Sequence, residues 1–507
     1  MMRGAIWAGA LAAALLLGLF ASPAAAEWKR AETTRFIVYS DGDARSLTEA
    51  ALQLELYESA LRLMHQLDPA AAPQNRIAIY LVGDEADLRK VQPELRENVA
   101  GFYRATHDDI FAIAIRERRE SSTLLHEYAH HFMIGSFSPG FPAWFIEGYA
   151  EYFSSAQLNS QRITLGEVSR GRGDWLTYTN WLPLNLILTR RPWEFQDSNA
   201  VSMYYAQSWL MTHWFISDPA RMAMFRNYVV RMQDGADPVA AMEAAVGMPI
   251  GRFEQTLRAY SRSRLPIKII TGVSLPRAEV TTTTLSRAEN DLLLLDLRLT
   301  SNGDQDDPAL LEEIRRRTAP YPTDPFARRL LARAELRLGE ASAARTVLEP
   351  LVAAVPTDAD ARRLLGEAIW TAARDGDLDN EALLAAVRAA RTHLSAAYEQ
   401  RPTDFRTLYL LAETRSISPS FPNDNDMETL LAALELAPQA SHVRLFAAQA
   451  HARRDELGPA IGLLYPLATS PHPDGATALA RALIDRYRAE MDDTDSEAAP
   501  SQDAPAT

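Results

Sequence analysis

The sequence predicts two folded units, an α+β domain over residues 27–270 and an all-α domain over residues 286–488. In the first half of the chain, short strand-like apolar runs are mixed with amphipathic helical runs, whereas the second half is rich in Ala, Leu and Arg at helical spacing. The length of 507 residues also exceeds what one hydrophobic core usually supports.

The first 26 residues have the composition of a secretory signal. Arg3 supplies a positive charge, residues 5–20 are apolar, and residues 24–26 are alanines that suit cleavage. The alternative is an uncleaved membrane anchor, because the apolar run is only slightly shorter than a spanning helix. The alanine site favours cleavage, so we expect an exported protein, periplasmic or secreted, with no stable membrane span after cleavage.

Composition restricts the chemistry. The chain has no cysteine, so disulfides are excluded and any metal ligands must be histidines or carboxylates. Its formal net charge of −14 argues against nucleic acid as a partner, because phosphate binding requires a basic face.

The first unit begins with a predicted strand, a helix and two further strands. Two helices follow these elements, and residues 200–264 are predicted to be helical in several pieces that are broken at Asp-Pro and Gly-Met-Pro sequences. The predicted strands cover residues 34–39, 76–82 and 109–115, and the predicted helices cover residues 45–67, 123–134 and 142–157.

A change in composition marks a linker over residues 271–285, after which the pattern is helical. Pro-Thr-Asp recurs at 322–324, 356–358 and 402–404, and the first two prolines are 34 residues apart, which is the period of tetratricopeptide repeats. The second unit resembles a degenerate tetratricopeptide array, and an irregular helical bundle is the alternative. Such repeats offer a concave surface for a protein partner. The acidic segment 489–507 is expected to be disordered.

The strongest chemical signal is the run His126-Glu127-Tyr128-Ala129-His130 on a predicted helix. Residues four apart lie on one helix face, so His126 and His130 can point at a single ion. Glu127 projects beside them, where it can hold a water molecule that the metal activates. A solvent-facing helix with two unrelated histidines is the alternative.

The next predicted helix carries two glutamates, Glu147 and Glu151, within Trp144–Tyr152. A turn between the two helices allows the second helix to present a carboxylate as a third ligand. Three protein ligands and one open position are typical of catalytic zinc. A surface helix with two glutamates four residues apart is the alternative.

Together these segments resemble the gluzincins of the peptidase MA clan, and in particular the peptidase MA-like group of exported bacterial proteins. Trp144 to Ala150 matches the Trp-x-x-Glu-Gly-x-Ala segment of the related M1 aminopeptidases residue by residue. The resemblance covers about residues 30–265 and implies a zincin-like catalytic fold that binds Zn²⁺ through His126, His130 and Glu147. It also implies that Glu151 accepts a hydrogen bond from the outer ring nitrogen of His126 or His130. The alternative is that Glu151, and not Glu147, is the third ligand.

The same resemblance extends to a tyrosine. Tyr205-Ala206-Gln207-Ser208 resembles the M1 segment whose tyrosine donates to the oxyanion, although the Lys-Gly of that segment is absent. Tyr204 is the second candidate, and a core tyrosine is the structural alternative. The chain lacks the Gly-x-Met-Glu-Asn segment with which M1 enzymes hold the substrate amino terminus, which favours an endopeptidase.

The predicted function is therefore an exported zinc metallopeptidase that hydrolyses a peptide or protein substrate. Glu127 and Tyr205 are the predicted catalytic residues, and the repeats are expected to bind substrate or a partner. The alternative function is a non-catalytic envelope scaffold that keeps the zincin-like fold and binds proteins through its repeats.

The other histidines are weaker candidates. His131 is rotated about 100° around the helix from His130, so it cannot join the same ion without distortion. His65, His107 and His213 are expected to be structural, with a position in a cleft as the alternative for His107.

Overall fold

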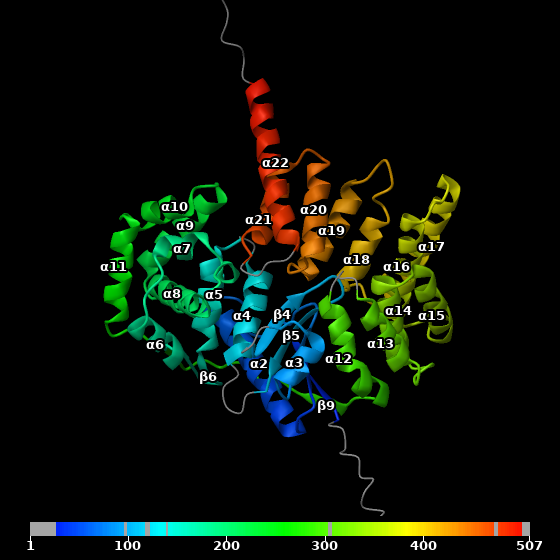
Figure 1. The fold of residues 1–507 in the computed structure, drawn as a ribbon, viewed down its shortest axis with the longest axis horizontal. Coiled ribbons are helices and arrows are strands. Elements are labelled where there is room, and N and C mark those ends of the chain that lie inside the picture. The colour runs from blue at the N-terminus through cyan, green and yellow to red at the C-terminus, as the bar shows by residue number, and fades with distance from the viewer. Residues whose placement is uncertain are drawn as a thin grey trace, which may run out of the picture.

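The computed structural model describes residues 27–95, 99–116, 122–137, 140–302, 307–470 and 475–498. These residues are mostly helical and include a six-stranded and a three-stranded sheet (Figure 1). The predicted signal, residues 1–26, lies outside them. In the described part of the chain, no helix combines the length and the apolar character that crossing a bilayer requires.

The six-stranded sheet has the strand order β4-β5-β3-β2-β1-β9. Its strands are β1 (Lys29–Glu32), β2 (Phe36–Ser40), β3 (Ile77–Val82), β4 (Gly101–Ala105), β5 (Ile110–Ile115) and β9 (Thr281–Thr284). The central strands β2, β3 and β5 pair in parallel, and the outer strands pair antiparallel. Parallel strands that are covered on both faces become continuous apolar runs, and β3 (IAIYLV) is such a run.

Helices cover both faces of this sheet. Side chains of α2 (Ala44–Met64) and α4 (Ser122–Ser136) join the core on one face. Side chains of α3 (Glu85–Val91) and α12 (Arg287–Asn302) join the core on the other face. Helix α4, which carries the histidine motif, therefore packs against the sheet and is held in a fixed position.

The segment after α4 builds a mainly helical lobe that continues the first unit (Figure 1). Its elements are α5 (Ala143–Ser154), β6 (Gln157–Asn159), β7 (Arg162–Leu165), α6 (Arg170–Tyr178), α7 (Leu184–Thr189), the 3-10 helix η1 (Pro192–Glu194), α8 (Ser198–Ile216), α9 (Pro219–Gln233), α10 (Pro238–Val246), α11 (Ile250–Ser261) and β8 (Lys268–Thr271). The predicted breaks at Asp218-Pro219 and Asp237-Pro238 are helix starts, where each aspartate accepts hydrogen bonds from the first turn.

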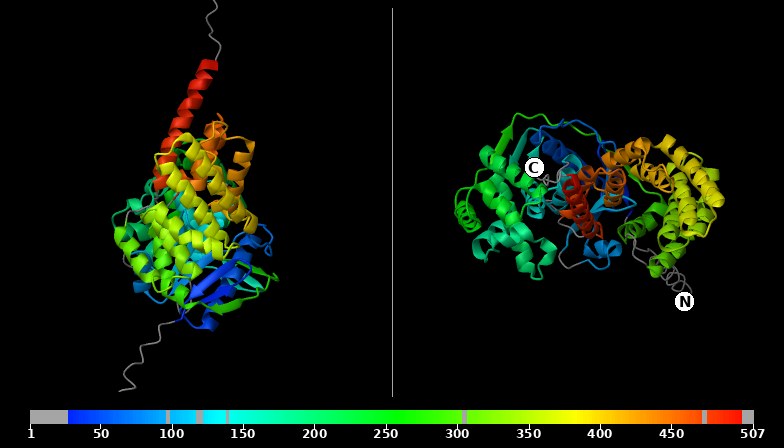
Figure 2. Two further views of the ribbon diagram at one scale, coloured as in Figure 1. Left: turned by 90° about the vertical axis from the view of Figure 1, so that its right-hand side faces the viewer. Right: turned by 90° about the horizontal axis from the view of Figure 1, so that it is seen from above.

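The remaining helices stack side by side into an arc that Figure 2 shows from above. They are α13 (Pro308–Thr318), α14 (Pro325–Leu338), α15 (Ala341–Ala354), α16 (Ala359–Asp375), α17 (Asn380–Gln400), α18 (Phe405–Glu413), α19 (Asp424–Leu436), α20 (Ser441–Ala452), α21 (Leu457–Ala468) and α22 (Gly475–Ala498). Asp324 and Asp358, from the repeated Pro-Thr-Asp, cap α14 and α16 by accepting from Ala327 N and Ala361 N. The recurring tripeptide therefore marks where repeat helices begin.

Two predicted boundaries differ from the structure. The sequence predicts a linker over residues 271–285, whereas Thr281–Thr284 form strand β9 and pair with β1. Threonine favours strands, and this exposed edge strand shows no apolar alternation by which it could be recognised. The sequence also predicts disorder over residues 489–507, whereas α22 continues to Ala498. Ala and Glu favour helix, and the first proline of this segment is Pro500.

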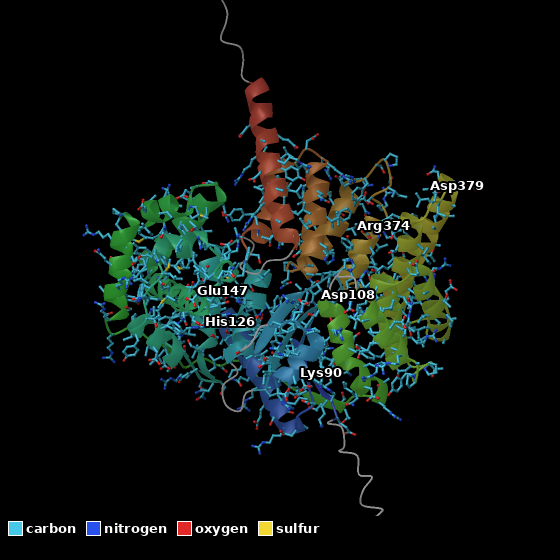
Figure 3. The ribbon with its side chains drawn as sticks, in the orientation of Figure 1. Lys90, Asp108, His126, Glu147, Arg374 and Asp379 are labelled. Atoms are coloured by element: carbon cyan, nitrogen blue, oxygen red, sulfur yellow. The ribbon has the colours of Figure 1, made fainter. Side chains whose placement is uncertain are left out.

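The repeats pack against the first unit through partly buried polar contacts. Arg337 Nη2, on α14, donates to Asp108 Oδ1 at 2.7 Å, and Arg406 Nη1, on α18, donates to the Asp108 carbonyl at 2.8 Å. Figure 3 shows Asp108 at this boundary. The side-chain Nε2 of Gln439, just before α20, lies 3.4 Å from the carbonyl oxygen of His131 on α4. The repeats thus contact the same helix that carries the histidine motif.

Candidate metal centre

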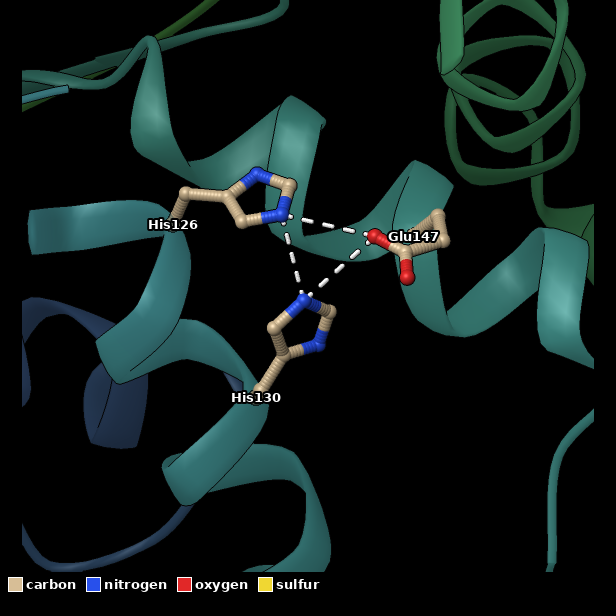
Figure 4. Close-up of side chains that lie close together, drawn as sticks. All are labelled: His126, His130 and Glu147. Atoms are coloured by element: carbon tan, nitrogen blue, oxygen red, sulfur yellow. Dashed lines mark hydrogen bonds and ion pairs between the residues drawn. The ribbon is translucent and has the colours of Figure 1, made fainter. Parts of the chain in front are cut away.

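His126, His130 and Glu147 come together between α4 and α5 (Figure 4). His126 Nε2 lies 3.1 Å from His130 Nε2, and Glu147 Oε2 lies 3.4 Å from each of these nitrogens. Ligands that surround zinc tetrahedrally at 2.0–2.1 Å are about 3.3 Å apart. Within the described part of the chain, no other group of His, Cys, Asp or Glu side chains is assembled in this way. The three atoms therefore match one face of a tetrahedral zinc site.

Local structure explains why these three side chains lie close together. The two histidines are one helical turn apart on α4. After the turn, Pro142 caps α5, and its carbonyl accepts from Phe145 N and Ile146 N. The aromatic side chains of α5, including Trp144, pack into the core and leave Glu147 facing α4.

Gly148 sets the distance between α5 and α8. A Cβ atom at this position would lie 2.2 Å from Thr212 Oγ1 and 2.3 Å from the Ser208 carbonyl oxygen. The absence of a side chain allows α8 to approach α5 closely. This approach brings Tyr205, on α8, next to the residues of the metal cluster.

The charges around the cluster favour a divalent cation. Glu147 is 0% exposed and His130 is 2% exposed, so charges here are poorly hydrated. The carboxylates of Glu127, Glu147 and Glu151 all act on His126, and the guanidinium of Arg172 is the nearby basic group. Three negative charges and one positive charge leave two negative charges, which a divalent ion balances when both histidines are neutral.

The pKa of His126 reflects these neighbouring charges. Burial alone would lower the pKa, but the hydrogen bond with Glu147 and the charges of Glu151 and Glu127 outweigh burial and raise it to about 9. Without a metal, His126 therefore carries a proton at neutral pH. A metal ion at this position would replace that proton.

Glu151 lies behind His126, where its Oε1 is 3.5 Å from His126 Nδ1. The Nε2 atom that faces Glu147 and His130 is the opposite ring nitrogen. Arg172, on α6, donates from Nε to Glu151 Oε2 at 2.8 Å and from Nη2 to Glu151 Oε1 at 2.6 Å. Sequence reasoning missed Arg172, because it comes from a different helix and no spacing rule connects it with α5.

Of the two candidate tyrosines, Tyr205 borders the cluster. Its ring centroid is 6.2 Å from that of His126, whereas Tyr204 is buried against Phe195. Burial and then the charges of the neighbouring glutamates raise the pKa of Tyr205 well above 10, although Arg172 lowers it. Tyr205 therefore keeps its proton at neutral pH and can donate a hydrogen bond.

Glu127 is partly buried and is not one of the three clustered residues. Its negative charge contributes to raising the pKa values of His126, of Tyr205 and of Tyr103 on β4. Glu127 is the residue next to His126 on α4, and its charge acts on the side chains that border the cluster.

Four of the other histidines contact tyrosine or arginine side chains. His65, His131 and His213 hydrogen-bond to tyrosine hydroxyls, and His107 bonds to Arg337 at the boundary with the repeats. A cavity of about 1030 Å³ lies between the sheet, α4 and the repeats, and His131 lines it. The residues of the metal cluster lie outside this cavity.

Comparison with known proteins identifies the repeats. Residues 325–368, from α14 into α16, match the family Tetratricopeptide repeat. The chain is similar to a thermophilic TPR protein of Thermus thermophilus, with 21% identity and a TM-score of 0.33 over 40% of this chain and 98% of that chain. It is also similar to a MamA double mutant, with 15% identity and a TM-score of 0.26 over 41% of this chain and 98% of that one. No curated protein matches the chain significantly.

Both TM-scores are below 0.5, so the assignment of repeats rests on the family match and on the stacked helices. The chain thus combines tetratricopeptide-type helices, which bind proteins in many contexts, with a sheet-containing unit that carries a three-residue cluster of metal-ligand type.

Proposed function

We propose that this protein is a zinc-dependent metallopeptidase of the gluzincin type, with His126, His130 and Glu147 as the metal ligands. The spacing of the three ligand atoms, 3.1, 3.4 and 3.4 Å, carries this proposal, because it matches the edges of a tetrahedral zinc site. The excess negative charge around the cluster supports it independently. The zincin-like fold of the first unit is part of the proposal.

Zinc at this position would supply Lewis acidity toward water and toward a substrate carbonyl. Glu127 would accept the proton of the attacking water and pass it to the leaving nitrogen as general base and then general acid. Tyr205, which keeps its proton, would donate a hydrogen bond to the oxygen that becomes negative in the transition state. The role of Tyr205 uses the protonation state that its surroundings favour.

The proposed substrate is an internal peptide bond of a peptide or protein. The absence of the segment that holds a substrate amino terminus in M1 enzymes supports an endopeptidase. The predicted signal supports an exported enzyme, periplasmic or secreted. The repeats would bind the substrate or a protein partner.

A protein-binding scaffold without catalysis is the second candidate function. The match of residues 325–368 to tetratricopeptide repeats favours it, since such repeats act in protein binding. In this function, zinc would stabilise the first unit and Glu127 would have no chemical role. The two functions therefore differ in what the loss of Glu127 does.

A peptide-library digest separates them. The zinc-loaded protein, the same protein with chelator and the Glu127→Gln variant are incubated with the library, and the products are identified by mass spectrometry. The peptidase proposal expects cleavage by the first sample alone. Zinc binding without cleavage of any peptide would reject the peptidase and favour the scaffold.

A further inference from the structure

Arg172 contacts two residues that border the metal cluster. Its guanidinium binds both oxygens of Glu151, at 2.8 and 2.6 Å, and its Cζ atom lies 5.2 Å from the centre of the Tyr205 ring. Glu151 Oε1, one of the two bound oxygens, is also the atom 3.5 Å from His126 Nδ1. A continuous chain of polar contacts therefore runs from α6 to the metal-facing imidazole.

We propose that Arg172 is a positioning residue that fixes His126 for metal binding by holding the Glu151 carboxylate. The inference rests on the metal site of the proposed function. It adds a residue from α6 to a site whose other members come from α4, α5 and α8.

The geometry of the pair gives the physical reason. A guanidinium that binds both oxygens of a carboxylate restrains its rotation as well as its position, which a single point contact does not do. Held in this way, Glu151 presents Oε1 to His126 Nδ1. A proton kept on Nδ1 leaves the Nε2 lone pair available to a metal, and Nε2 faces His130 and Glu147.

Charge supports the same role. The side chain of Glu151 is 11% exposed, and that of Glu147 is fully buried. Without Arg172, Glu151 would be a poorly hydrated carboxylate near two others, so its position against His126 would be less well defined. The contact with the Tyr205 ring also holds that side chain beside the cluster.

The test compares zinc affinity, measured by competition with a chelator, in Arg172→Gln, Arg172→Lys and a control. Arg258→Gln is the matched control. Arg258, on α11, also donates twice to a glutamate, Glu254, and its Cζ atom lies 4.5 Å from the centre of the Trp181 ring. We expect Arg172→Gln to lower the zinc affinity by about 10–100-fold. Arg172→Lys should lose less zinc affinity, since lysine keeps the positive charge but cannot bind both carboxylate oxygens in the same way. Arg258→Gln should bind zinc like wild type.

A double-mutant cycle with Glu151→Gln tests whether Arg172 acts through Glu151. If it does, Arg172→Gln costs little further affinity once Glu151 has been replaced. The absorption spectrum of the cobalt-substituted protein should change alike in both single variants. The proposal would be overturned if the losses of zinc affinity in the two single variants add fully in the double variant. It would also be overturned if Arg172→Gln binds zinc as tightly as the Arg258→Gln control.

Metal-free melting temperatures show whether each variant folds. If Arg172→Gln does not fold, the comparison passes to Arg172→Lys, and wild-type zinc affinity and cobalt spectrum in that variant would overturn the proposal. These readouts do not require hydrolysis. Zinc-loaded wild type that cleaves no peptide would reject the proposed peptidase while the cycle still decides the role of Arg172.

Discussion

Replacing Gly148 with alanine should force α5 and α8 apart. The new Cβ would lie 2.2 Å from Thr212 Oγ1, 2.3 Å from the Ser208 carbonyl oxygen and 2.7 Å from the Ser208 carbonyl carbon. The Ser208 atoms are backbone, so a change of rotamer cannot relieve the overlap. Overpacking usually costs about 1–3 kcal/mol, and contact with backbone places this substitution at the upper end, about 3 kcal/mol.

The assay is thermal unfolding, with Gly251→Ala as the control. A loss of about 3 kcal/mol lowers the melting temperature of a unit of this size by roughly 6–12 °C. At Gly251, on α11, a Cβ would meet nothing within 4 Å, so that variant should be as stable as wild type or more stable by up to about 1 kcal/mol. Zinc-loaded Gly148→Ala should also hydrolyse peptides more slowly than wild type, because Tyr205 moves with α8. Equal melting temperatures for the two variants would refute this reasoning.

Three further predictions concern the site and the boundary with the repeats. Glu147→Ala removes a ligand, so the purified variant should contain no stoichiometric zinc by elemental analysis, and full occupancy would contradict the ligand assignment. Glu127→Gln should keep its zinc and melting temperature but lose about 10²–10⁴-fold in peptide turnover, and wild-type turnover would remove its role as base. Asp108→Asn should destabilise the protein by about 1.5–3 kcal/mol in urea at neutral pH. Burial alone would raise the pKa of Asp108, but Arg337 and His107 hold it well below the usual value. Stability from this carboxylate is therefore present above about pH 4 and lost as the pH falls toward the lower folded pKa, so the difference between variant and wild type should shrink on acidification. A pH-independent difference would contradict that assignment.

The sequence predicts the central strands better than the outer ones, for a physical reason. The runs at 34–39, 76–82 and 109–115 correspond to β2, β3 and β5, which are packed into the sheet and are therefore apolar. The strand β1 (KRAE) is half-buried and the edge strand β9 (TTTT) is exposed, so neither is an apolar run that carries such a signal. Pairing between β1 and β9 joins residues about 250 positions apart, which no local pattern specifies.

At the site, local spacing identifies the residues that share a helix. His126 and His130 are one turn apart, so a motif reveals them. The partner of Glu151 comes from another helix, and the contact between Arg337 and Asp108 spans 229 positions. Such contacts depend on how helices pack, which explains why Arg172 and the polar boundary with the repeats were not predicted.

The location of zinc tests the central claim most directly. Anomalous X-ray scattering at the zinc edge, from crystals of the zinc-loaded protein, should give one strong peak about 2.0–2.2 Å from His126 Nε2, His130 Nε2 and a Glu147 carboxylate oxygen. Crystals of Glu147→Ala grown in the same way should lack that peak. A wild-type map with no peak between α4 and α5, or with zinc bound at other residues, would contradict the account.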